Sequence, residues 1–290
     1  MSQITYKRFA SVVTNCINTV ISVLKISVQS KFGIRFPKVG GDRCIVLATG
    51  PSLKLSLQKH PEVFKNTPLV CVNSFAISSE FQELKPTYYV ILDPFFWERE
   101  NEVTISTFKN LTEKTCWKLY LFIPQYALNQ KVFTDLQKRN SNIELKPFNY
   151  TVFKGFKGVA HWFYKKNLAM PQSLSVMAPA LFLAVNMGFK EVFLVGADHL
   201  WHENLYMSED NILHSKVPHF YENEIEIKYV PFYKSGIPER GIQKAHEFFD
   251  IWSRTFYSYI LINEYAESRK RTIYNASEVS FIDAFKRIKL

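Results

Sequence analysis

Short apolar runs recur along the chain from residue 44 onward, separated by stretches whose apolar residues have helical spacing. Such runs, most of them followed by a polar or proline-containing turn, are typical of a parallel sheet covered by helices. They predict strands at residues 44–48, 69–72, 88–92, 118–122, 143–146 and 192–195. The expected fold class is therefore α/β, with a mostly parallel Rossmann-like sheet and helices on both faces.

The longer periodic stretches predict two helices in the C-terminal half. One covers residues 175–187 and ends at Gly188, with Pro179 in its first turn. The other covers residues 239–263, and its helical apolar stripe is expected in the core: Ile242, Ala245, Phe249, Trp252, Phe256 and Ile260. A short strand near Ile273 and a helix capped by Ser277 are expected to complete the fold.

The first 40 residues stand apart from this pattern. An uncharged run at residues 9–24 lies between basic residues, and it contains the polar residues Thr14, Asn15, Asn18 and Thr19. The run is shorter and more polar than the roughly 20 apolar residues of a membrane span. Its spacing predicts an amphipathic helix, which either lies on an anionic membrane or packs on the domain. We therefore divide the chain into an N-terminal helix at 1–40 and one α/β domain at 41–290.

Residues 201–238 lack steady periodicity and are rich in histidine and tyrosine. An irregular segment of this length is commonly functional, so we expect a lid-like insertion over the sheet.

Composition narrows the partners and the compartment. The 290 residues carry a net charge of +10, from 36 Lys and Arg against 26 Asp and Glu, which favours an anionic partner. Nucleic acid is not expected, because the basic residues form no long tract and no RNA-binding aromatic motif is present. The four cysteines are far apart and form no disulfide or zinc pattern, which favours a reducing cytosol.

The turn after the first strand is a candidate nucleotide site. Thr49, Gly50, Pro51 and Ser52 connect a buried strand to a helix start, where a hydroxyl and free backbone N–H groups could hold phosphate or ribose. The turn is neither the dinucleotide fingerprint nor a P-loop. An ordinary structural turn is the alternative.

Other polar residues follow the neighbouring strands. Because ligands of open α/β sheets bind outside the carboxyl ends of the strands, these residues should converge on one crevice. They are Asn73 and Ser74, Asp93 and Pro94, and Gly196 and Asp198. For Asn73 and Asp93 the structural alternative is an Asx turn, and for Asp198 it is a cap on the following segment.

Histidines near the last of these strands are candidate general bases. His199, His202, His214 and His219 have no metal-ligand spacing, so we expect one of them to act as a base and no metal to bind. Tyr206 could donate a hydrogen bond to a leaving phosphate, with core packing as its alternative role.

Four motifs together resemble the single-domain bacterial sialyltransferases that decorate lipooligosaccharide with CMP-sialic acid. They are residues 50–54 (GPSLK), 71–75 (CVNSF), 93–96 (DPFF) and 187–198 (MGFKEVFLVGAD). The resemblance implies a GT-A-like fold without a metal-binding DxD motif. It implies that Thr49, Gly50 and Ser52 line the CMP phosphate and ribose, that Asn73 and Asp93 contact nucleotide or sugar, and that Gly196 and Asp198 hold the cytidine side.

The chain departs from that family at three places. Ser175 lies near the family's Thr-Ser-Gly substrate loop, which here reads Ser-Val-Met. Tyr206 keeps the place of a tyrosine that assists phosphate departure, whereas Leu200 replaces its companion. Tyr233 and Lys234 stand near the place of the family's catalytic histidine. The base is therefore expected to be His199, His202 or His219, or the donor sugar differs.

These observations predict a metal-independent glycosyltransferase without a cofactor. Its substrate would be a CMP-activated sialic, Kdo, legionaminic or pseudaminic acid, and its acceptor a glycan or glycolipid of the bacterial surface, as in lipopolysaccharide or capsule synthesis. The expected location is cytoplasmic and peripheral to the inner membrane, with an anionic membrane surface and a second copy of the chain as candidate partners. Two alternatives remain: a pyrophosphokinase-like enzyme that needs Mg²⁺, and a non-catalytic nucleotide- or glycan-binding protein.

Overall fold

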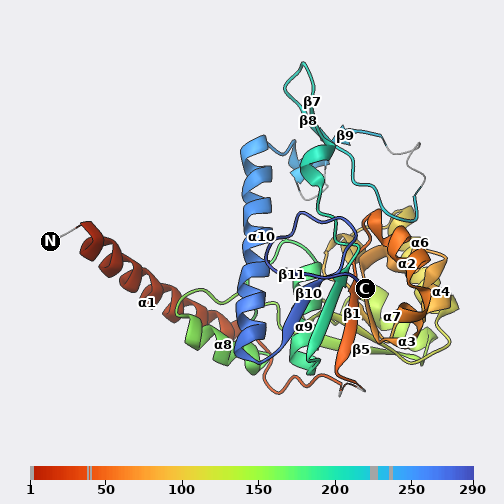
Figure 1. Ribbon diagram of the computed structural model, residues 1–290, viewed down its shortest axis with the longest axis horizontal. Helices are drawn as coiled ribbons and strands as arrows, with labels where there is room; N and C mark the ends of the chain where they lie inside the picture. Colours follow the sequence, from red (N-terminus) through yellow and green to blue (C-terminus); the bar gives the residue numbers. More distant parts are fainter. Residues whose placement is uncertain (1–2, 38, 40, 223–227, 235–237) are drawn as a thin grey trace.

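The computed structural model describes residues 3–37, 39, 41–222, 228–234 and 238–290. Within these residues the sheet has eight strands in the order β11-β10-β6-β1-β2-β3-β4-β5, and every neighbouring pair is parallel (Figure 1). The strands are β1 (Arg43–Leu47), β2 (Leu69–Val72), β3 (Tyr88–Val90), β4 (Leu119–Pro124), β5 (Ile143–Phe148), β6 (Glu191–Val195), β10 (Thr272–Asn275) and β11 (Lys286–Arg287). All six strands predicted from the apolar runs, and the strand near Ile273, are confirmed.

The strand order reverses at β1. Strands β2 to β5 extend from one side of β1, whereas β6 pairs with its other side over five residues from Arg43 to Leu47. A reversal of this kind opens a crevice at the carboxyl ends of the two strands. The fold therefore places the turns after β1 and β6 side by side.

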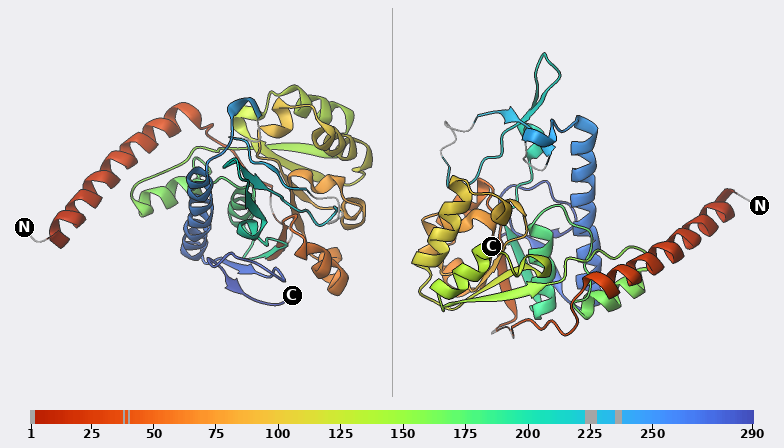
Figure 2. Two further views of the ribbon diagram at one scale, coloured as in Figure 1. Left: turned by 90° about the horizontal axis from the view of Figure 1, so that it is seen from above. Right: turned by 180° about the vertical axis from the view of Figure 1, so that it is seen from behind.

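Helices cover both faces of the sheet (Figures 1 and 2). One face packs against α2 (Ser52–Lys59), α3 (Pro61–Asn66), α4 (Glu80–Leu84), α5 (Phe95–Glu98), α6 (Glu102–Lys114) and α7 (Lys131–Arg139). The other packs against α8 (Lys157–Lys165), α9 (Met177–Met187) and α10 (Ala245–Ser268). Alternate strand residues enter the two cores, as the pleat requires: Val46 faces α9, whereas Ile45 and Leu47 face the opposite layer. The predicted α/β class is confirmed.

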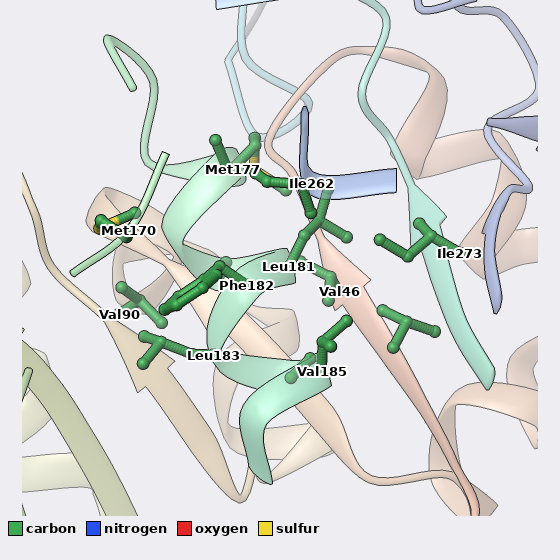
Figure 3. Close-up of a cluster of buried hydrophobic side chains, with 14 of the residues drawn as sticks. Val46, Val90, Met170, Met177, Leu181, Phe182, Leu183, Val185, Ile262 and Ile273 are labelled. Atoms are coloured by element: carbon green, nitrogen blue, oxygen red, sulfur yellow. The ribbon is translucent and has the colours of Figure 1, made fainter. Parts of the chain in front are cut away.

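Helix α9 forms the centre of one core. It contacts β1, β2 and β6 on one side and α10 on the other, and Figure 3 shows Leu181, Phe182 and Val185 among strand side chains. Gly188 ends the helix with a φ of 113°, a left-handed conformation that glycine adopts without strain. The prediction of this helix and its stop is confirmed.

Two predictions for the C-terminal region are wrong. The buried stripe of α10 runs through Phe248, Trp252, Tyr259 and Ile262, whereas Phe249 is 53% exposed. Apolar and aromatic residues occur on both sides of this helix, so spacing alone selected the wrong stripe except at Trp252 and at the partly buried Phe256. No helix follows residue 277 among the described residues; there the chain leads to β11.

Two further segments extend from the sheet and its covering helices. The predicted lid segment contains the 3-10 turn η3 (Trp201–Asn204) and a three-stranded antiparallel sheet of β7 (Leu205–Met207), β8 (Leu213–Ser215) and β9 (Val230–Pro231). At the other extreme, α1 (Gln3–Gln29) projects from the body, with its C-terminal part beside α8 (Figures 1 and 2). Residues Arg8–Gln29 of α1 are long and apolar enough to cross a membrane by length and composition, and an 18-residue window within them has a mean hydropathy of 1.5.

Candidate functional site

A cavity of about 840 Å³ lies at the carboxyl ends of β1, β2 and β6, where the strand order reverses. Eleven of the residues selected from the sequence line it: Thr49, Gly50, Pro51, Ser52, Asn73, Ser74, Ser175, Gly196, Asp198, His199 and His219. The expected convergence is therefore present for the turns after β1, β2 and β6, whereas Asp93 and Pro94, which follow β3, do not line this cavity.

The turns after β1 and β6 touch each other at two glycines. A Cβ atom on Gly50 would lie 2.5 Å from the Gly196 carbonyl oxygen and 2.8 Å from Asp198 Cγ. Gly196 has a φ of 71°, and a Cβ there would lie 2.7 Å from the Leu53 Cβ. Both positions therefore require glycine, one for close approach and the other also for its left-handed backbone.

The backbone N–H groups of this turn are already occupied, contrary to the expectation that they are free for phosphate. The N–H of Gly50 donates to the Gly196 carbonyl (2.9 Å), and the N–H of Ser52 donates to Asp198 Oδ2 (2.9 Å). Those of Leu53 and Lys54 donate within the turn. The N–H groups of the first turn of α2 therefore form hydrogen bonds within the protein and are not available to an anion.

Asp198 acts as a remote cap for α2. Its second carboxylate oxygen accepts a hydrogen bond from the Ser52 hydroxyl, and the side chain is only 8% exposed. Burial raises the pKa of Asp198, and the hydrogen bonds from Ser52 oppose that rise. Asp198 thus joins β6 to α2 at the floor of the cavity.

Residues 217–222 cross the carboxyl ends of β1 and β2 and form one wall of the cavity. His219 Nδ1 lies 3.0 Å from Thr49 Oγ1, and the Phe220 N–H donates to the Thr49 carbonyl (3.0 Å). Tyr221 stacks on the His219 ring and shares a 2.7 Å hydrogen bond with Ser74. Strand-end hydroxyls therefore hold this part of the insertion over the sheet.

His219 has the geometry of a general base. Among the described residues Nδ1 is its hydrogen-bonded ring nitrogen, so Nε2 is the atom that would accept a substrate proton. Burial lowers the pKa of His219, while the nearby Glu222 raises it. The imidazole is accordingly neutral at neutral pH, as a base must be.

His199 also lines the cavity but has a different environment. Its Nε2 lies 2.7 Å from the Tyr259 hydroxyl, and its ring stacks on Trp201 at 4.2 Å. Complete burial lowers the pKa of His199 to about 3. A histidine of so low a basicity is a poor proton acceptor, so packing and hydrogen bonding explain it better than base catalysis.

Asn73 is the polar residue in the cavity that most needs a ligand. Its side-chain oxygen Oδ1 is buried and has no hydrogen-bond partner. Its backbone is left-handed, with a φ of 45°, and the Tyr89 hydroxyl holds its carbonyl at 2.5 Å. A buried oxygen without a partner costs about 1–3 kcal/mol, so this one is suited to a ligand hydroxyl or amino group.

A second cavity of about 870 Å³ adjoins the first and shares Asn73, Ser175 and Trp201 with it. Asp93 and Pro94 line this cavity, and Asp93 Oδ1 accepts the N–H of Phe95 (3.0 Å), the Asx turn that was the alternative to a ligand role. Three cations, Arg99, Lys234 and Arg240, also line it, together with the carboxylate of Glu98. Among the described residues lining the first cavity there is no lysine or arginine, so the cationic charge lies in the second.

Three selected residues line neither cavity. His214 lies in β8, with its Nδ1 3.0 Å from the Ile212 carbonyl oxygen. His202 packs against Phe281, with ring centroids 4.5 Å apart, and Tyr206 is 52% exposed on β7. Their suggested catalytic roles remain predictions without support from the geometry. Ser175 accepts the N–H of Met177 (3.3 Å) and so begins α9.

Two tyrosines beside the site were not predicted from the sequence. Tyr221 stacks on His219 within a turn, where strand alternation does not apply and no local pattern indicates the contact. Tyr259 comes from α10, far along the chain, and its contact with His199 depends on tertiary packing alone.

The described residues contain no group of three or more His, Cys, Asp and Glu that could hold a metal ion. The carboxylates lining the first cavity are Asp198, Glu203 and Glu278.

Fold and site together define a Rossmann-like α/β protein with a crevice at the switch point of its sheet. A family model described as "6-hydroxymethylpterin diphosphokinase MptE-like" matches residues 16–204, well over half of the chain. The chain belongs to this MptE-like family.

Comparison with solved structures supports the fold. The MAf glycosyltransferase from Magnetospirillum magneticum AMB-1 is similar, with a TM-score of 0.50 and 11% sequence identity over 89% of this chain. The matched part is 35% of that protein, so the chain spans about a third of its length. No curated protein matches the chain. Neither likeness is specific for sialyltransferases or for CMP-sugars.

Proposed function

We propose that this protein is a glycosyltransferase that moves an acidic sugar from a CMP conjugate to a hydroxyl of a surface-glycan acceptor. The observation that carries the proposal is Asn73, whose buried Oδ1 lacks a partner where two cavities meet. An amide oxygen there can accept from the cytosine amino group or from a sugar hydroxyl.

The two adjoining cavities support a transfer between two substrates. The first, which the described residues line without lysine or arginine, suits a nucleoside with its hydroxyls. The second carries Lys234 and Arg240, and these suit the carboxylate of an acidic sugar or the phosphate next to it. Lys234 forms a 2.7 Å ion pair with Glu247, so Arg240 is a stronger candidate for the sugar than Lys234.

His219 supplies the base in this proposal. Its Nε2 takes the proton of the acceptor hydroxyl as the acceptor oxygen bonds to the anomeric carbon. The bond between that carbon and the phosphate oxygen breaks, and CMP leaves with the electron pair. Thr49 holds the opposite ring nitrogen and so orients the imidazole. No metal or cofactor is assigned a role.

A ligand screen tests the nucleotide. Stabilisation follows affinity, so CMP should raise the Tm more than UDP, GDP or ATP at equal concentration. The Asn73→Gly variant keeps the left-handed backbone and removes the amide, and it should lose the CMP shift. A Tm increase with UDP alone would contradict the CMP assignment.

Family membership favours a second function, transfer of diphosphate from a nucleoside triphosphate to a hydroxymethylpterin. Asp198, Glu203 and Glu278 are the carboxylates that such a reaction could use with Mg²⁺. Formation of pterin diphosphate from ATP and 6-hydroxymethylpterin, abolished by EDTA, would establish it. CMP-sugar turnover that persists in EDTA would establish the first function instead.

A third reading is a binding protein without catalysis. CMP binding with neither hydrolysis nor transfer of CMP-sialic acid, CMP-Kdo or their relatives would support that reading.

A further inference from the structure

Helix α1 is attached to the rest of the protein by its polar side. The least exposed positions of its described part are Asn15, Asn18, Thr19, Ser22 and Ile26, which recur three or four residues apart and are polar except for the last. Such spacing marks one face of a helix. The alternative from the sequence, a helix that packs its apolar stripe on the domain, would bury the opposite face.

Specific contacts hold this polar face in place. The Ser22 hydroxyl donates to the Lys154 carbonyl (2.8 Å) and accepts from its N–H (2.9 Å). The Thr19 hydroxyl accepts the N–H of Phe156 (3.0 Å). Gly155, which lies between Lys154 and Phe156, has a φ of 128°, and a Cβ on it would lie 2.2 Å from Thr19 Oγ1. The two segments are thus in close contact, with no space for a side chain at Gly155, and this contact positions α1 beside α8.

The opposite side of α1 is apolar and exposed. Ile17, Val20, Leu24 and Val28 are 54%, 59%, 61% and 84% exposed. They point away from the face that Ser22 anchors, and Figures 1 and 2 show most of α1 projecting away from the sheet. An exposed apolar stripe of this length marks an interaction surface.

The side-chain charges of the two segments that meet beside this stripe, residues 1–37 and 151–170, are all positive. Residues 1–37 and 151–170 contain no Asp or Glu. Their exposed cations are Arg8, Lys25, Lys31, Arg35, Lys154, Lys157, Lys165 and Lys166. One of them, Lys157, forms an ion pair with Glu264 of α10 at 3.0 Å.

Helix α8 adds an aromatic anchor to these cations. Trp162 is 54% exposed, and the Lys166 ammonium lies 6.0 Å from its ring centroid. Exposed tryptophan together with lysine is the combination that settles at the headgroup level of a bilayer.

We propose that α1 and α8 form one bilayer-binding surface, with the apolar stripe of α1 among the acyl chains and the cations of both helices on anionic headgroups. The helix lies in the interface rather than across the bilayer, because its C-terminal half is bound to residues 154–156, which carry Lys154. In this proposal the protein has a fixed orientation on the membrane, and this orientation does not depend on what the cavities bind.

Vesicle cosedimentation of the full chain tests this surface. We expect binding to phosphatidylcholine vesicles that contain phosphatidylglycerol, and at least tenfold weaker binding for Val20→Asp. Val63→Asp, which places the same change on an exposed valine of α3, is the matched control and should bind like the unmodified protein. The double variant Lys165→Gln/Lys166→Gln should weaken binding on the order of tenfold on anionic vesicles only. The Tm of each variant should be unchanged.

Three results would overturn the proposal. Equal binding of Val20→Asp and Val63→Asp, or no binding at all, would remove the bilayer as the occupant. A lipid-free dimer that Val20→Asp dissociates would assign the stripe to a second copy of the chain. Resistance of the bound protein to alkaline carbonate extraction would indicate a helix that crosses the bilayer.

Discussion

Two histidines line the same cavity, the buried His199 and the half-buried His219, and their partners decide what each can do. Burial lowers the pKa of both His199 and His219, but His219 has Glu222 nearby to oppose the shift. His219 contacts Thr49 just after the carboxyl end of β1, whereas His199 packs between Trp201 and Tyr259. For the proposed function, this difference favours His219 over His199 as the base.

The replacement His219→Ala should lower the rate of sugar transfer by roughly 10²- to 10⁴-fold, the usual contribution of a general base. The reacting form is the neutral imidazole, so the rate should fall as the pH drops through the lowered pKa of His219, below 6.5. A pH profile of kcat for CMP-sugar turnover measures this effect. His202→Ala provides the comparison, and a larger loss there than in His219→Ala would refute the assignment.

His199 should instead control stability at low pH. Its pKa is 6.5 when unfolded and about 3 when folded, so folding favours the neutral ring. The contribution of neutral His199 to the free energy of unfolding is complete above pH 6.5. This contribution is lost as the pH falls toward 3, by up to about 1.4 kcal/mol per pH unit. His199→Asn tolerates the left-handed backbone of this position, with its φ of 52°. Denaturant unfolding at several pH values should show a weaker pH dependence in this variant than in the unmodified protein.

At the scale of elements, the junction between the β1 and β6 turns depends on contact between glycine and backbone. Gly50→Ala would place a methyl group 2.5 Å from a carbonyl oxygen, and neither turn can move without breaking hydrogen bonds to Ser52. We expect a loss of about 1–3 kcal/mol of unfolding free energy, as for other overpacked sites. Gly158→Ala in α8 meets no atom within 4 Å and is the control. Equal thermal midpoints for the two variants would show that the junction is not tight.

The elements differ in how well the sequence predicts them, for physical reasons. Strands buried on both faces are continuous apolar runs, so β1 to β4 and β6 were readable from hydropathy alone. The edge strand β5 contains Glu144 and Lys146 and is only partly buried, so its apolar signal is weaker. The stripe of α10 was misassigned because Phe249 and Ile260 repeat at the same spacing as the buried residues. Asp198 lies 146 residues from Ser52 in the sequence, and it accepts the N–H of Ser52 in the turn after β1. No local sequence pattern indicates that this N–H group is occupied.

At the scale of the molecule, the proposed function divides the recognition of one donor between the two cavities, with the nucleoside in the first and the acidic sugar in the second. The nucleoside cavity is a product of the strand order, so its lining residues follow strand ends and were largely predictable. The second cavity takes Lys234 and Arg240 from the irregular segment that precedes α10, where periodicity carries no information, and Arg99 from the end of α5. A change in the second cavity should therefore affect the sugar without affecting the nucleoside.

Arg240→Gln tests this division, because it removes a cation that lines only the second cavity. A hydrogen bond to a charged group contributes about 1.5–3 kcal/mol, so the KM for a CMP-activated acidic sugar should rise by roughly ten- to a hundredfold. The Tm increase caused by CMP alone should stay as in the unmodified protein. Arg254→Gln removes a surface arginine of α10 that pairs with Asp250 and should leave both quantities unchanged. Equal weakening of CMP and of the donor by Arg240→Gln would place the charge on the nucleotide phosphate instead of the sugar carboxylate, since that phosphate is the one anionic group the two ligands share.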